Sequence, residues 1–80
     1  MDAIRDHRGM FKVTFRDARN ERDLTDGVFL PDVPAPGDAI HIRERAHHGS
    51  SQSGHVTRRH WHIATKEPGE SEVVVLVALD

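Results

Sequence analysis

The stretch EVVVLVAL, residues 72–79, is apolar on both of the faces that a β-strand would present. One face would carry Val73, Val75, Val77 and Leu79, and the other Val74, Leu76 and Ala78. Such a strand is either buried on both faces or covers its second face with a partner. We predict a partner surface made of Val74, Leu76 and Ala78, used for self-association into a homo-oligomer or for docking another protein. Cover by other parts of the chain is the alternative.

Four stretches before this one also have the composition of strands. In FKVTFR (11–16), Phe11, Val13 and Phe15 alternate with polar residues, as in a strand with one buried face. The other three are GVFLP (27–31), DAIHIRER (38–45) and HVTRRHWHIAT (55–65). Turn-forming residues separate the strands, and no stretch has the pattern of an amphipathic helix. The sequence predicts one all-β domain over residues 10–80, preceded by an N-terminal arm over residues 1–9.

Five short strands in an 80-residue chain favour a small, strongly bent barrel, because closing a sheet removes its exposed edges. The Gly/Ser-rich segment AHHGSSQSG (46–54) is expected to form the mobile tip of a central hairpin. The charged excursion after the first strand, the sequence PGDAIHI (36–42) and the Val-rich last strand together resemble the small SH3-like barrels of short bacterial and phage proteins. An OB-like barrel is the alternative. The resemblance implies a module that binds peptides, nucleic acids or other subunits of an assembly.

The composition limits the kinds of protein and site that the chain can form. The sequence has no cysteine, which removes disulfides, thiolate zinc sites and cysteine nucleophiles. The longest apolar run, residues 73–79, is far shorter than the roughly 20 residues that a membrane-spanning helix needs. We therefore expect a cytoplasmic protein without a membrane segment. In a domain of this size the margin of stability is thin, so partner binding would add to it.

Three histidines are candidate zinc ligands. If the apolar residues of the two central strands share a face, antiparallel pairing places His41 opposite His60 or His62. Directly opposed Cβ atoms lie about 5 Å apart, which is compatible with three imidazoles on one ion. The alternative is that all three are ordinary exposed strand residues in a His-rich chain. The sequence thus offers His41, His60 and His62 as a structural zinc site, and no other cofactor is expected.

A second candidate is a nucleic-acid surface on residues 43–62. Four arginines lie in this stretch against a single glutamate: Arg43, Arg45, Arg58 and Arg59. They could contact phosphates along the central hairpin. The net charge of −2 and the small number of aromatic residues, one Trp and three Phe, argue against a protein dedicated to nucleic acid. A solvated, charged hairpin is the alternative.

Trp61 stands between His60 and His62, and strand alternation places it on the face opposite to theirs. We predict that Trp61 is the largest residue of the core, since a single Trp with polar neighbours is most often buried.

The sequence gives little support to catalysis. Ser50, Ser51 and Ser53 lie near His48 and His55 in the sequence, but in a segment expected to be mobile, which cannot hold a nucleophile and its base at the required separation. No phosphate-binding loop or nucleophile elbow is present in the sequence. We therefore expect a protein that is not an enzyme.

Overall fold

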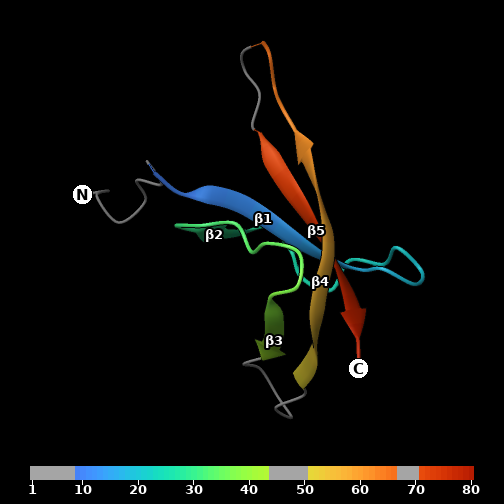
Figure 1. The fold of residues 1–80 in the computed structure, drawn as a ribbon. Helices are drawn as coiled ribbons and strands as arrows, with labels where there is room; N and C mark the ends of the chain where they lie inside the picture. Colours follow the sequence, from blue (N-terminus) through green and yellow to red (C-terminus); the bar gives the residue numbers. More distant parts are fainter. Residues whose placement is uncertain (1–8, 44–50, 67–70) are drawn as a thin grey trace.

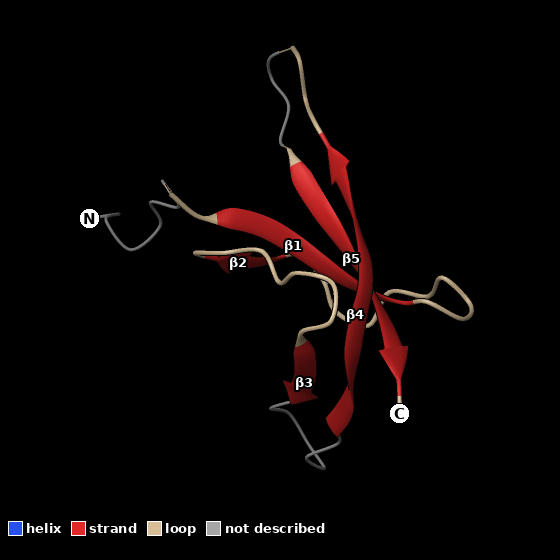
Figure 2. Cartoon of the chain, in the orientation of Figure 1, coloured by secondary structure: helices blue, strands red, loops and turns tan. Residues whose placement is uncertain are grey.

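Five β-strands make up a computed structural model that describes residues 9–43, 51–66 and 71–80 (Figure 1). Their bounds are β1 (Phe11–Asp17), β2 (Val28–Leu30), β3 (Ala39–Arg43), β4 (Ser51–His62) and β5 (Glu72–Leu79). None of the described residues is helical (Figure 2), and none forms a helix long and apolar enough to cross a bilayer. Each strand overlaps a stretch predicted from alternation or from composition, so the all-β prediction is confirmed. The predicted N-terminal arm lies outside the described residues, apart from Gly9.

The strands form one mixed sheet in the order β2-β1-β5-β4-β3. Paired strands that follow one another in the chain are antiparallel, whereas β1 and β5 pair in parallel. The direction of the chain reverses between successive strands, so the first and last of five strands run the same way. The pair that joins them must therefore be parallel. The sheet curls through 248° into a half-barrel whose edges are β2 and β3.

The core lies on one face of the central strand β5, which we call the core face. Val73, Val75 and Val77 of β5 are almost fully buried there. Val13 and Phe15 of β1 lie opposite the first two, and Val56 of β4 lies opposite the third: Val13, Phe15, Val56, Val73, Val75 and Val77 form the buried cluster. Burial of each valine side chain contributes about 1.5 kcal/mol or more to stability. The core is thus built mainly by β1, β4 and β5.

The opposite face of β5, the outer face, is also covered within the chain. Val74 and Leu76 are only 4% and 7% exposed, and Ala78 is half-buried. The strand neighbours of Leu76 are Arg16 and Arg58, whose aliphatic stems can cover an apolar residue while their charged ends stay in water. Val74 and Leu76 therefore do not present the exposed apolar face that the sequence predicts. The central position of β5 is the reason.

A β-bulge in β4 sets the direction of every later side chain in that strand. Val56 lies opposite Val77 and Arg58 lies opposite Leu76, so Thr57 is an extra residue without a partner on β5. The Thr57 hydroxyl donates to the Leu76 carbonyl oxygen at 3.3 Å, which holds the bulge in place. After the bulge, the odd-numbered residues of β4 lie on the core face and the even-numbered ones on the outer face.

Strand β4 begins earlier in the chain than the sequence predicts. Residues 51–54 were expected in the mobile hairpin tip, but they form the start of β4 and pair with β3 and β5. The remainder of the predicted tip falls within residues 44–50, which lie outside the described residues. The strand therefore has 12 residues, and its first half is the part that pairs with β3.

Candidate functional site

An aromatic pair lies at one end of the core face. Phe11 begins β1, and Trp61 lies near the end of β4, opposite Val73. Their rings meet edge to face, with centroids 5.9 Å apart and ring planes at 82°. Trp61 is on the predicted face but is 48% exposed, so the prediction that it is a core residue is wrong. The buried cluster ends at Val73, and Trp61 lies beside its last layer rather than inside it.

Met10, Phe11, Trp61 and Ile63 form an exposed apolar surface, which we call the Trp61 surface. Met10 is 44% and Ile63 is 63% exposed. Together with Lys12, Ser71, Glu72 and Val73, these four residues line a pocket of about 260 Å³. Sites for small molecules and cofactors usually have about 300–1,000 Å³. The pocket is therefore better matched to one or two side chains of a partner than to a free cofactor.

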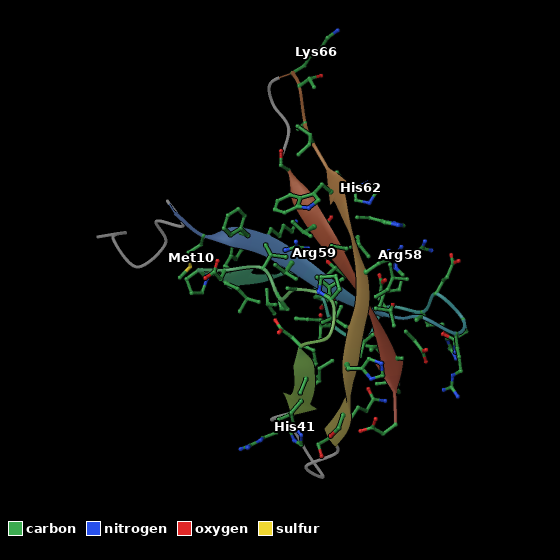
Figure 3. All side chains as sticks on the ribbon, viewed as in Figure 1. Met10, His41, Arg58, Arg59, His62 and Lys66 are labelled. Atoms are coloured by element: carbon green, nitrogen blue, oxygen red, sulfur yellow. The ribbon has the colours of Figure 1, made fainter. Side chains whose placement is uncertain are left out.

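Arg59 lies beside the Trp61 surface on the core face of β4. It is half-buried, opposite Val75 and two residues before Trp61. Within the described ranges, its guanidinium makes no hydrogen bond or ion pair. Figure 3 shows Arg59 and Met10 on one side of β4, and Arg58 and His62 on the other. The apolar surface is thus flanked by a cation that no described carboxylate neutralises.

Next to these side chains, one edge of β4, which we call its free edge, pairs with no described strand. Strand β3 pairs only with Ser51–His55 of β4. On that side, Val56 forms the next backbone hydrogen bonds. Its carbonyl accepts from the Gly37 N–H, and its N–H donates to the Asp38 carbonyl. Beyond Val56, no described strand pairs with that edge of β4 as far as His62. An unpaired edge of this kind presents N–H and C=O groups that a further strand can use.

The three histidines predicted to bind zinc are not brought together. His41 lies opposite Ser53 and exchanges a 3.1 Å hydrogen bond with its hydroxyl. Ser53 precedes His60 by seven residues in β4, a separation of about 23 Å along a strand. His60 and His62 instead lie opposite Val74 and Glu72 of β5. The predicted register is wrong, and the described residues contain no cluster of three metal-binding side chains.

The arginines predicted to bind nucleic acid lie on both faces of the sheet. Arg43 and Arg58 are exposed on the outer face, whereas Arg59 lies on the core face. Arg45 falls outside the described residues. The outer face of β4 after the bulge carries Arg58, His60 and His62 in consecutive outward positions. These three residues form a row of cationic and hydrogen-bonding side chains. Only Arg58 among them belongs to the predicted nucleic-acid surface.

No protein-family model, curated protein or solved structure matches the chain. The candidate site therefore stands on its geometry alone. Sequence reasoning missed Met10, Phe11 and Ile63 as surface residues because alternation gives the face of a side chain and not how far the core extends along the strand. The signal that points to the site is Trp61 itself.

Proposed function

We propose that the protein is a non-enzymatic interaction module that docks an apolar segment of a partner protein on the Trp61 surface. The observation that carries this proposal is the half-exposed edge-to-face pair of Phe11 and Trp61 beside Met10 and Ile63. Trp and Arg are among the residue types enriched at the positions that dominate binding energy at interfaces, and here Arg59 lies two residues before Trp61. The docking surface in this proposal lies at the end of the sheet, and the second face of β5 is not part of it.

The size of the surface favours a partner segment over a permanent homodimer. Four large side chains left about half exposed offer roughly 100 Å² each, or about 400 Å² in all. A stable interface between two proteins needs about 800 Å² from each side. The Trp61 surface is therefore suited to a short segment that inserts one or two apolar side chains.

We infer that the half-barrel belongs to the SH3-like class of small barrels. This inference is supported by the five strands, the charged excursion between β1 and β2 and the Pro-Gly turn before β3. The resemblance also fits a binding role, since peptide binders are among such barrels. Fold alone does not decide function, so the proposal rests on the surface and not on the class.

Selection from a displayed library of random peptides tests the docking proposal. The wild-type protein should recover peptides that carry a large apolar residue, and Trp61→Ala should weaken their binding about tenfold or more. Since Trp61 is the sole Trp, its fluorescence reports binding directly for the wild type and for variants that keep Trp61. His41→Ala, at the far end of the sheet, is the matched control and should bind as wild type. Recovery of no peptide that depends on Trp61 would overturn the proposal.

A second candidate function is the binding of nucleic acid on the outer face of β4. Arg58, His60 and His62 point outward there, and the neighbouring Glu72 carboxylate accepts a hydrogen bond from Thr14. Arg58→Glu should abolish salt-dependent binding to single-stranded DNA, because it reverses the charge of the arginine in this row. No binding of single- or double-stranded probes at low salt would exclude this function.

A further inference from the structure

We propose that the partner segment binds as an added β-strand on the free edge of β4, next to Arg58–His62. Its apolar side chain would contact Trp61 at the β4 border of the Trp61 surface, and a carboxylate two residues away would pair with Arg59. This inference rests on the proposed function, because it specifies how a segment reaches the same surface. It assigns the partner class as an extended peptide with an acidic residue and an apolar residue on one face.

The pairing of β4 supplies the first step of the argument. On one side, β5 pairs with β4 as far as His62, so this part of β4 is held in an extended conformation. On the other side, β3 stops at His55 and no described strand continues in its place. A peptide added there would gain main-chain hydrogen bonds from a preformed strand, as in other cases of strand addition.

The alternation of side chains supplies the second step. Arg59 and Trp61 are two residues apart and lie on the core face, so their side chains emerge about 7 Å apart along the strand. An added strand has the same spacing, so its residues i and i+2 face the same way. One of them would meet Trp61, the member of the aromatic pair that lies on β4, and the other the guanidinium. The neighbouring residues of the peptide would point to the outer face, beside His60.

The charge of Arg59 determines which kind of peptide side chain would bind beside it. Arg59 is half-buried and has no described carboxylate partner, so an acidic side chain would form a charge-assisted hydrogen bond there. A basic side chain would meet like charge at short range. The surface therefore discriminates between peptides by the residue two positions from the apolar residue as well as by the apolar residue itself.

The synthetic peptide acetyl-KTETFTKT-amide tests this inference, because its Glu and Phe are two residues apart. We expect it to change the fluorescence of Trp61 and to bind at least tenfold more tightly than acetyl-KTKTFTKT-amide. Arg59→Glu should reverse this preference, and Arg59→Lys should keep it. Urea unfolding of each variant checks that the fold is retained.

Two N-methylated forms of the first peptide separate strand addition from side-chain docking. In each form the methyl groups block the N–H groups of alternate residues, so one form loses the hydrogen bonds to β4 and the other keeps them. We expect one form to lose binding at least tenfold and the other to bind as the parent. Equal binding by both forms would overturn the inference, as would equal binding of the Glu and Lys peptides. If neither peptide affects Trp61 while the library yields peptides that depend on Trp61, the strand-addition inference fails and the docking proposal stands.

Discussion

Gly54 of β4 packs directly against the backbone of Ala78 in β5. A Cβ atom on Gly54 would lie 2.9 Å from the Ala78 carbonyl carbon and closer still to its oxygen. Gly54 is buried and pairs with Ile40 on one side and Leu79 on the other. The two strands can approach this closely only because no side chain stands between them.

Replacement of Gly54 by alanine should therefore destabilise the fold strongly. We expect Gly54→Ala to lower the free energy of unfolding by about 3 kcal/mol, because the atoms that the methyl group meets are backbone and cannot rotate away. Urea unfolding followed by circular dichroism measures the change. Gly27→Ala is the matched control, since the three atoms nearest to a Cβ there all belong to the flexible side chain of Lys12. Equal losses in the two variants would contradict this account of the β4–β5 contact.

Leu76 should contribute to the stability of the single chain and not to self-association. It is buried on the outer face of β5 between Arg16 and Arg58. We expect Leu76→Ala to cost about 2–3 kcal/mol and Leu76→Met less than about 1.5 kcal/mol, as for buried leucines in general. Thermal unfolding at several protein concentrations checks this. A midpoint that rises with concentration in the wild type and not in Leu76→Ala would instead indicate an oligomer interface.

The five strands could be predicted from the sequence because alternation and turn residues carry that information locally. Phe11, Val13 and Phe15 of β1 are an example, since the period of two is visible in the letters alone. The doubly apolar pattern of residues 73–79 indicated either a strand buried on both faces or one that covers its second face with a partner. In the structure these residues belong to β5, the central strand of the sheet. These features depend on neighbours in the chain, so one sequence suffices to find them.

The register of β3 against β4 could not be predicted, and the candidate site depends on it. Aligning the apolar residues placed β3 against residues 55–65, whereas β3 pairs with Ser51–His55, before the bulge at Thr57. The pairing partners of Ile40 and Ile42 are Gly54 and Gln52, which have no apolar side chain to signal the match. His41 was therefore assigned to the wrong end of β4. The bulge is not the cause, because His41, His60 and His62 all lie on the outer face as predicted, and only the position of β3 along β4 differs.

Gly37 should be required for its backbone conformation and not for space. The Asp38 N–H donates to the Ala35 carbonyl at 3.0 Å, Pro36 occupies the second position of this turn, and Gly37 has a φ of 94°. These are the features of a type II turn, in which the third residue is usually glycine. A Cβ on Gly37 would meet no atom within 4 Å.

We expect Gly37→Ala to lower the free energy of unfolding by about 1 kcal/mol, which is the cost of a left-handed conformation for alanine. Gly37→Asn should cost less, because asparagine adopts this region more readily. Chemical denaturation of the two variants side by side gives the comparison. If asparagine were as costly as alanine, a steric or packing role would have to replace the conformational one.

Asp17 should stabilise the turn after β1 through its side chain. It is 4% exposed, and its Oδ1 accepts a hydrogen bond from the Arg19 N–H at 2.9 Å. The Arg19 guanidinium lies 3.5 Å from Oδ2, but that side chain is 75% exposed, so the ion pair should contribute little. The hydrogen bond from the Arg19 backbone N–H to the Asp17 side chain fixes the first residues of the turn and is therefore the main contribution of Asp17 to stability.

Asp17→Ala should cost about 1–2 kcal/mol, because it removes the acceptor of the Arg19 N–H. Arg19→Ala keeps that hydrogen bond and should cost less than about 0.5 kcal/mol. Asp17→Asn keeps an acceptor oxygen and should lie between the two. Urea unfolding of all three variants tests the order. If Arg19→Ala were as destabilising as Asp17→Ala, the ion pair and not the turn would be the source of the stability at Asp17.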